Sequence, residues 1–302
     1  MKKIPVIIDT DPGVDDVFAL LIAFKNKKLD VKLVCSTAGN VNIENTTNNT
    51  LYITKKYSPN TLVAKGIGSP LQKEFVDASD VHGESGVGGF VIPKHNYKLD
   101  YDDVILAMKE VIEKSTEKVT IITLGPITNL ASFIKACPNL LNKIECVYSM
   151  IASVDGSGNV TPYAEFNSYC DPEALDIVVK SGLNIVFVPK QVGEITMIEQ
   201  KRFFEMGNKN ETSKMIVEIL SGFHEKAVDS NYAAIYDQNA VFALTNPKYY
   251  KFMNCDVTVD VSDEKRGQTF INIIKNKKSN LRCVFVKNPK KLSNAIFKEL
   301  YR

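Results

Sequence analysis

Four aspartates follow a short apolar run near the start of the chain. Asp9, Asp11, Asp15 and Asp16 fall within the stretch VIIDTDPGVDD, residues 6–16. Carboxylates this close together repel one another, and an apolar strand beside them tends to bury them. A cation stabilises such a group, and oxygen ligands alone favour a hard one, Ca²⁺ or Mg²⁺. The stretch therefore predicts a metal site.

Two further roles for these aspartates stay open from the residues alone. Asp15 and Asp16 are placed to cap the start of a helix, where carboxylates accept hydrogen bonds from free N–H groups and meet the positive end of the dipole. Capping accounts for one or two aspartates, not for four. An aspartyl-phosphate phosphatase also carries Asp-x-Asp after its first strand, but it has Thr or Val where this chain has Gly13, which weakens that hypothesis.

Polar residues also follow other apolar strands of the chain. Asn40 comes after VKLVCSTAG, and Leu124 precedes a Gly-Pro pair, so its carbonyl has no simple helical continuation. The segment GNVTPYAEFN brings Asn159, Glu165 and Asn167 close together. Ligands of open α/β sheets bind beyond the carboxyl ends of the strands. Amides and carboxylates gathered there suit a polyhydroxylated ligand, because each hydroxyl can both donate and accept a hydrogen bond.

These residues need a sheet to bring them together, and the apolar pattern predicts one. Buried strands such as KIPVIID alternate with helices such as DDVFALLIAFKN along most of the chain, which is typical of a mainly parallel sheet covered on both faces. Short strands follow one another from about residue 253 and predict an antiparallel addition before a final helix. We expect one α/β domain over residues 1–302, with a mostly parallel central sheet flanked by helices and a small antiparallel addition near the C-terminus.

Composition sets limits on the partners and the compartment. The chain has 302 residues, with 37 basic against 35 acidic ones and a net charge of +2, so its charge gives no case for a nucleic-acid or membrane partner. Its six cysteines form no CxxC pair and no zinc-like spacing. The apolar run at the N-terminus is too short for a secretory signal. We expect a cytoplasmic protein with reduced thiols.

The motifs in their order along the chain resemble a known family. DTDPGVDD, AGNV, HGESG, TLGPITNLA, GNVTPYAEFN, DPEA and RGQT are similar to those of the inosine–uridine-preferring nucleoside hydrolases. The resemblance spans nearly the whole chain and implies the nucleoside hydrolase-like fold. The activity it implies is hydrolysis of the N-glycosidic bond of ribonucleosides to a free base and ribose, with a small-molecule ribonucleoside as the partner and a homodimer or homotetramer as the assembly.

The resemblance also implies a metal centre. Its cofactor would be Ca²⁺, held by Asp11, Asp16, the carbonyl of Leu124 and Asp237, and Asp9 would support these ligands from behind. Asp11 would also act as the general base toward a water on the metal. The residues implied to bind the substrate are Asp15, Asn40, Met150, Asn159, Glu165 and Asn167.

One position departs from the family pattern. Many members carry a His before the late aspartate, where it protonates the departing base, and this chain has Tyr236. Three possibilities stay open: Tyr236 substitutes for the acid, the base is stabilised in another way, or the substrate has changed. His82, in HGESG, is the first candidate for contact with the leaving base, whereas His95 is expected to be structural and His224 lies on a predicted helix.

A second hypothesis belongs to another class of protein. A calcium-dependent nucleoside- or ribose-binding protein with little or no turnover would keep the metal and sugar ligands and lose the leaving-group machinery, and Tyr236 fits that description. Asp11 argues against it, because a pure binder gains nothing from a base directed at a metal-bound water.

Overall fold

The apolar run before the aspartates forms strand β1 (Ile4–Thr10) in the interior of a large sheet. The computed structural model describes residues 2–222 and 231–302. β1 pairs in parallel with β2 (Leu29–Ser36) on one side and β4 (Val119–Thr123) on the other. Ile7 and Ile8 are both fully buried. Both faces of β1 are therefore covered, as its continuous apolar sequence requires.

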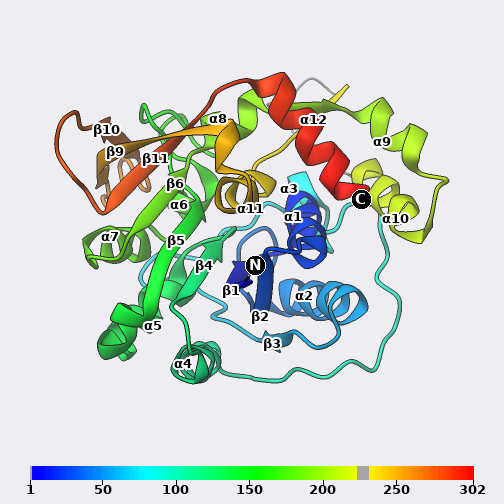
Figure 1. Cartoon of the computed structure of the whole chain (residues 1–302), viewed down its shortest axis with the longest axis horizontal. Helices are drawn as coiled ribbons and strands as arrows, with labels where there is room; N and C mark the ends of the chain where they lie inside the picture. The colour runs from blue at the N-terminus through cyan, green and yellow to red at the C-terminus, as the bar shows by residue number, and fades with distance from the viewer. Residues whose placement is uncertain (1, 223–230) are drawn as a thin grey trace.

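The central sheet combines a long parallel part with an antiparallel edge. Its other strands are β3 (Leu62–Ala64), β5 (Ile144–Met150), β6 (Ile185–Val188), β9 (Tyr250–Val259), β10 (Thr269–Ile273) and β11 (Leu281–Val286). Within the described residues the sheet has nine strands in the order β10–β9–β11–β6–β5–β4–β1–β2–β3 (Figure 1). β9 runs antiparallel to both of its neighbours, and the other pairs are parallel. The predicted fold class, including the antiparallel addition near the C-terminus, is confirmed.

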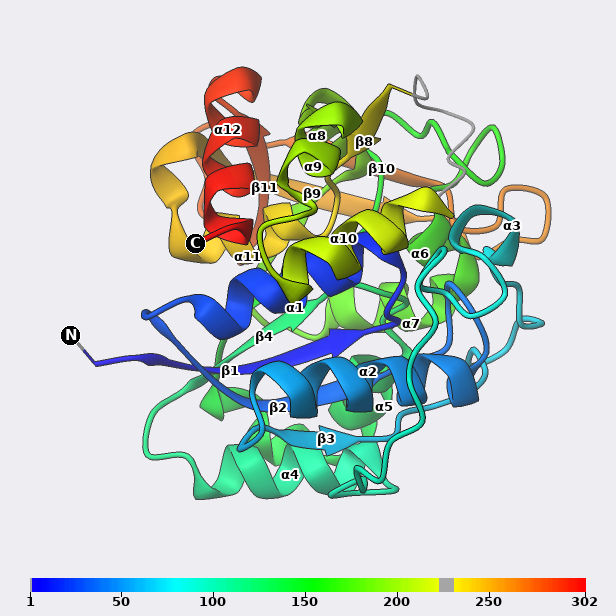
Figure 2. The same cartoon turned by 90° about the vertical axis from the view of Figure 1, so that its right-hand side faces the viewer.

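Helices cover both faces of this sheet. The described helices are α1 (Val14–Lys25), α2 (Ile43–Tyr57), α3 (Ser79–His82), α4 (Val104–Lys114), α5 (Thr128–Ala136), α6 (Phe166–Cys170), α7 (Pro172–Lys180), α8 (Lys190–Ile195), α9 (Gln200–Met206), α10 (Glu211–Ser221), α11 (Gln238–Thr245) and α12 (Pro289–Leu300), with 3₁₀ turns at Pro138–Lys143 and Pro247–Tyr249. One core contains residues of α1, α11 and α12, and the other contains residues of α4, α5 and α7. Figure 2 shows α1 and α4 on opposite sides of β1.

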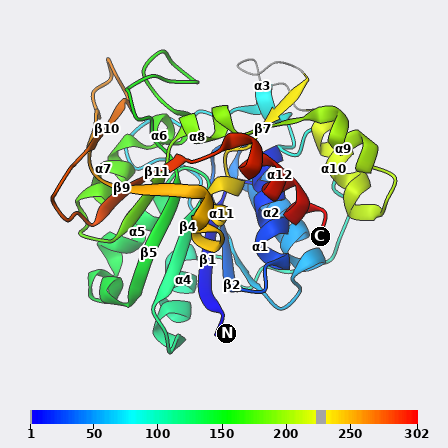
Figure 3. The ribbon, with the colours of Figure 1, turned by 45° about the horizontal axis from the view of Figure 1, so that its top comes forward.

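The order of the strands fixes where a ligand can enter. From β1 the chain moves outward to β2 and β3, and from β4 it moves in the opposite direction to β5 and β6. The sheet therefore has a topological switch point between β1 and β4, where the two halves diverge and leave room beyond the strand ends. In Figure 3 the strands rise from the N-terminus at the lower edge toward α3, α6 and α8 at the upper edge.

The part of the chain between β6 and β9 was the least evident from sequence. It contains α8, α9, α10 and a separate antiparallel pair, β7 (Met197–Glu199) with β8 (Tyr232–Ala234). The glycine-rich segment 77–97 contains the short helix α3. Among the described helices, none is long and apolar enough to cross a membrane.

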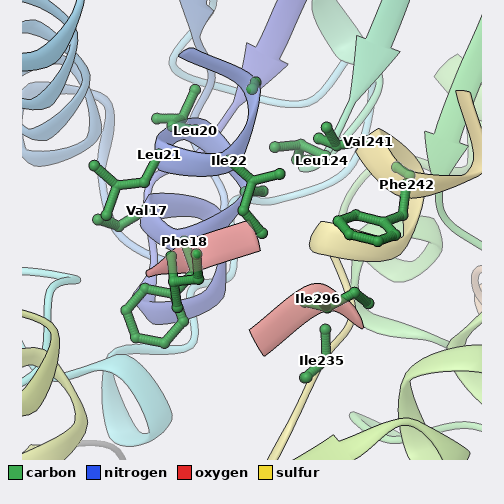
Figure 4. Close-up of a cluster of buried hydrophobic side chains, with 14 of the residues drawn as sticks. Val17, Phe18, Leu20, Leu21, Ile22, Leu124, Ile235, Val241, Phe242 and Ile296 are labelled. Atoms are coloured by element: carbon green, nitrogen blue, oxygen red, sulfur yellow. The ribbon is translucent and has the colours of Figure 1, made fainter. Parts of the chain in front are cut away.

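Helix α1 is held by apolar contacts on nearly all sides. Leu20, Leu21 and Ile22 are fully buried, and Figure 4 shows them in one cluster with Val241 and Phe242 of α11. A helix that is apolar all round belongs in the interior of a protein. Since Asp15 and Asp16 lie in the first turn of α1, this packing also fixes their orientation.

Truncation of this cluster should destabilise the whole fold. Leu20→Ala removes a fully buried side chain, and we expect it to lower the free energy of unfolding by about 2–5 kcal/mol. Leu106→Ala on α4 is the matched control, because Leu106 is 47% exposed and its change should stay within about 0.5 kcal/mol. Urea denaturation measures both, and equal losses would contradict the assignment of this core.

Candidate active site

A cavity of about 490 Å³ lies at the carboxyl edge of the sheet, next to the switch point. Leu124 and Met150 contribute to its wall from the ends of β4 and β5. The sequence-predicted site residues that line it are Asp15, Asp16, Asn40, His82, Leu124, Met150, Asn159, Glu165, Asn167, Tyr236 and Asp237. Segments far apart in the sequence therefore meet in one cavity, and Asp11 is the predicted residue that is not on its wall.

Three carboxylates converge on the wall of this cavity. Oxygen atoms of Asp15, Asp16 and Asp237 all lie within 4.8 Å of one another. Asp16 accepts hydrogen bonds from the Thr10 hydroxyl at 2.6 Å and from the Gly13 N–H at 3.0 Å. Its orientation is thus fixed from the end of β1 and the start of α1. An all-oxygen set of this kind fits a hard divalent cation.

Asp11 is buried beside these carboxylates and held by its neighbours. Its Oδ2 accepts a hydrogen bond from the Asn40 N–H at 2.8 Å, and Asp11 is 1% exposed. A Cβ atom at Gly39 would lie 2.1 Å from Asp11 Oδ2, and one at Gly125 would lie 2.2 Å from Oδ1. Two glycines, one after β2 and one after β4, therefore leave just enough room for the carboxylate. Both glycines belong to motifs that carry the family resemblance, AGNV and TLGPITNLA, but the sequence did not show that they pack against Asp11.

The side chain of Asn40 connects the two buried aspartates. Its Nδ2 donates to the Asp11 carbonyl and to Asp16 Oδ2, each at 3.1 Å. Together with its backbone N–H, Asn40 therefore makes three contacts with the acidic segment. The family resemblance implies that Asn40 binds the substrate. The structure shows in addition that Asn40 holds the carboxylates of Asp11 and Asp16 in position.

Burial of several carboxylates raises their pKa values. The pKa of Asp11 is raised well above its ordinary range, first by burial and then by the charge of Asp16. Burial also raises the pKa of Asp237, and the charges of Asp15, Asp16 and Asp11 raise it further. Asp9, whose carboxylate accepts from Asn129 behind the site at 2.7 Å, has its pKa raised to about 8 by burial. A bound cation would offset these penalties, because it favours the charged carboxylates.

The opposite wall carries two asparagines and a glutamate. Asn167 Nδ2 donates to the carbonyls of Leu124 and Met150 at 2.8 and 3.0 Å. Asn159 Oδ1 accepts from the Phe166 N–H at 2.9 Å. Glu165 accepts from backbone N–H groups at the start of α6. These contacts bind the wall together, so each side chain has a fixed orientation toward the cavity.

His82 takes part in a backbone hydrogen bond. Its Nδ1 accepts from the Val14 N–H at 3.1 Å, so the proton of the neutral ring is on Nε2. Burial lowers the pKa of His82 to about 4, and the ring is therefore neutral near pH 7. His95 packs between the rings of Tyr52 and Tyr97, away from the site. His224 lies outside the described residues.

Tyr236 lies beside Asp237 on the cavity wall. A Cβ atom at Gly193 would lie 2.0 Å from Tyr236 Cδ1, so the ring packs directly on the backbone of α8. The wall also includes Asp77, Asp80 and Val81, which the sequence pattern did not single out. They belong to the glycine-rich segment and to α3, and only the fold brings that segment over the strand ends.

Comparisons with known proteins agree with this geometry. The model of the family described as inosine-uridine preferring nucleoside hydrolase matches residues 6–294. The non-specific ribonucleoside hydrolases RihC of Escherichia coli O127:H6 and Shigella boydii serotype 18 are each 33% identical over 272 residues, covering 90% of this chain and 89% of theirs. A plant nucleoside hydrolase, PpNRh1, has a similar fold with a TM-score of 0.90, 24% identity and 98% coverage of each chain. The purine-preferring ribonucleoside hydrolase from Gardnerella vaginalis has a TM-score of 0.89, with the same identity and coverage.

The fold and the site define an α/β enzyme whose carboxylate-lined cavity can hold a metal ion. The chain belongs to the inosine-uridine preferring nucleoside hydrolase family. The resemblance seen in the motifs is thereby confirmed, and so is the prediction of an enzyme of this family.

Space around Asp11 should be essential to metal binding. In Gly125→Ala the new methyl group would overlap the Asp11 carboxylate, while the backbone before Pro126 still accommodates alanine. Asp11 lies beside carboxylates that could hold a metal ion, so we expect displacement of its carboxylate to lower the affinity for a divalent cation such as Ca²⁺ by on the order of tenfold or more. Calorimetric titration measures this, and an affinity equal to that of the wild type would contradict the tight fit.

The stabilisation by metal should increase with pH. In the metal-free protein the raised pKa values of Asp11 and Asp237 mean that folding favours their protonated forms. That contribution is complete below the ordinary carboxyl pKa and is lost as the pH rises through the raised values. Metal binding needs the charged forms, so the rise in Tm on adding Ca²⁺ should be small near pH 5 and larger near pH 8. Thermal unfolding with and without chelator tests this, and a constant rise would contradict it.

Proposed function

We propose that this enzyme hydrolyses the N-glycosidic bond of ribonucleosides to a free base and ribose, in a calcium-dependent reaction. The observation that carries the proposal is the meeting of buried carboxylates and wall amides in one cavity at the switch point. Carboxylates suit a cation and the cis hydroxyls of a ribose, and amides suit the remaining hydroxyls. The names of the curated relatives, non-specific ribonucleoside hydrolases, support the same substrate class.

The proposed metal ligands are Asp11, Asp16, Asp237 and the carbonyl of Leu124. Asp16 and Asp237 belong to the converging set of carboxylates, and the Leu124 carbonyl has a second lone pair beside its bond from Asn167. Bound Ca²⁺ would supply a more acidic water and charge stabilisation. The preference for Ca²⁺ over Mg²⁺ rests on the family resemblance.

Asp11 is proposed to accept the proton of the attacking water. Its Oδ2 accepts a hydrogen bond from the Asn40 N–H, and Oδ1 is the proposed proton acceptor. A positioned base of this kind contributes about 10²- to 10⁴-fold to the rate. Asp9, from behind, supports the end of β1 through its bond with Asn129.

The sugar is proposed to be held by hydroxyl contacts on two sides. Asp15 and Asn40 take the 2′ and 3′ hydroxyls, and Asn159, Glu165 and Asn167 take the 5′ and 3′ side, with Met150 against the ring. Such contacts reject deoxyribose, since a missing hydroxyl leaves buried polar groups unpaired.

His82 and Tyr236 are proposed to contact the departing base. His82 is neutral and its Nδ1 is occupied, so it can donate a hydrogen bond from Nε2 but is a poor acid. Tyr236 can donate from its phenol, in the position where many relatives have His. The alternative proposal, a calcium-dependent nucleoside or ribose binder, rests on this same replacement.

The described cysteines are all buried and unpaired, which supports a reducing compartment such as the cytoplasm. A homodimer or homotetramer is the assembly proposed from the family resemblance.

Measuring the release of free base distinguishes the proposed hydrolase from the alternative, a nucleoside- or ribose-binding protein. We expect the purified protein to release free base from uridine, cytidine, inosine or adenosine with Ca²⁺, and to stop after chelation. Asp11→Asn should lower kcat by about 10²- to 10⁴-fold while nucleosides still bind. Asp30→Asn is the control, because Asp30 forms a surface ion pair with Lys32. Chromatography follows the reaction, and tight binding without release from any nucleoside would favour the binder.

A further inference from the structure

The RGQT segment (Arg266, Gly267, Gln268 and Thr269) enters β10 next to the cavity, but none of its residues is on the cavity wall. We propose that this segment is a clamp that positions Asn159 and Asn167 for the sugar. The inference rests on the proposed function, because it assigns positioning residues to the same site.

Arg266 bonds three backbone carbonyls, on two segments, through its guanidinium group. Its Nε donates to the Tyr169 carbonyl at 2.7 Å, and a terminal nitrogen donates to the carbonyls of Cys170 and Glu74 at 3.0 and 3.1 Å. Tyr169 and Cys170 end α6, and Glu74 lies in the segment that leads to α3. The guanidinium also stacks 4.3 Å from the centre of the Tyr169 ring. A lysine cannot reproduce this fork of planar donors.

Helix α6 needs such support, since it has five residues and isolated helices this short are unstable. Glu165 caps its start by accepting from the N–H groups of Asn167 and Ser168. Arg266 satisfies carbonyls at its end. Asn167 therefore lies on a short helix that is held at both ends by charged side chains.

Gly267 allows the clamp to approach α6 closely. Its φ is +75°, and a Cβ atom there would lie 2.6 Å from Tyr169 Cα. A side chain at this position would meet both a strained backbone and a backbone clash. The glycine thus brings Arg266 within reach of the carbonyls.

The other half of the clamp holds the loop before Asn159. Thr269 Oγ1 accepts from the Ser153 N–H at 2.7 Å and donates to the Ser153 carbonyl at 3.1 Å. Gln268 Nε2 donates to the Gly156 carbonyl at 3.0 Å. Both residues are buried. The loop is therefore attached at two points just ahead of Asn159.

Apart from the bond of Arg266 to the Glu74 carbonyl, the described side-chain hydrogen bonds of the clamp go to the segments that carry or flank the two asparagines. None of those described goes to a carboxylate of the acidic cluster. Its connection to the proposed metal ligands runs through Asn167, which donates to the Leu124 carbonyl, so the clamp should affect sugar affinity far more than metal affinity. A merely structural role would lower stability without separating these two affinities.

The test compares Arg266→Lys and Thr269→Val with Arg282→Lys. Arg282 is also half-buried, but it contacts Cys146 and Phe252 on the sheet, away from the cavity. We expect both clamp variants to lower kcat/KM for a ribonucleoside by on the order of tenfold or more, mainly through KM. Their Kd for Ca²⁺, measured by calorimetry, should stay within about twofold of the wild type, and Arg282→Lys should match the wild type in both.

The clamp is overturned if KM in Arg266→Lys and Thr269→Val equals that in Arg282→Lys, or if the Kd for Ca²⁺ rises in step with KM. If Arg266→Lys does not fold, Thr269→Val decides, because it keeps the shape of the side chain and removes the hydroxyl. If the wild-type protein releases no base, the proposed function fails. The clamp is then judged by the same comparison on uridine and inosine affinity.

Discussion

The repulsion between buried carboxylates is the constraint on which the rest of the site depends. The charges of Asp15 and Asp16 raise the proton affinity of Asp11 and Asp237 across short distances, in a region where little water can screen them. Without compensation such a group would favour protonation or local opening. Hydrogen bonds from the Asn40 N–H, the Gly13 N–H and the Thr10 hydroxyl supply part of that compensation. A cation would supply the rest of the compensating positive charge. It could reach the cluster, because Asp15, Asp16 and Asp237 lie on the wall of the cavity.

The sheet makes this concentration of charge possible by using strand ends. β1 and β4 are neighbours that lead the chain in opposite directions, so the backbone beyond them diverges and leaves N–H and C=O groups free to turn inward. Gly39 and Gly125 then let two turns close on Asp11 without a side chain between them. The apolar packing of α1 behind the cluster keeps Asp15 and Asp16 in place despite their mutual repulsion. The turns at Gly39 and Gly125 and the packing of α1 therefore act together to hold the charged side chains close to one another.

The fold could be predicted from sequence largely because each strand and helix shows its own apolar pattern within a short stretch of residues. KIPVIID and DDVFALLIAFKN form β1 and α1 as expected, and the antiparallel strands near the C-terminus were evident from their quick succession. The segment that contains α8, β7, α9 and β8 was not, because each of these elements has seven residues or fewer and is too short to show a clear period. The clustered charges of Asp9, Asp11, Asp15 and Asp16 were enough to predict a metal site, whereas Asp237 could be assigned to it only through the family resemblance. The fit of Gly39 and Gly125 around Asp11 depends on contacts between turns far apart in the sequence, which no local pattern contains.

The acidic cluster also has a consequence for the order in which the molecule is made. Asp16 leaves the ribosome early and Asp237 late, yet their carboxylates meet at one point. A nascent chain that ends before α11 holds part of a cation site and the full repulsion of its first aspartates. Such a chain lacks the complete set of carboxylates, because Asp237 joins the first aspartates only after a long loop has closed. Capture of a cation by the full set would therefore follow the completion of the domain and would consolidate it once synthesis has passed α11.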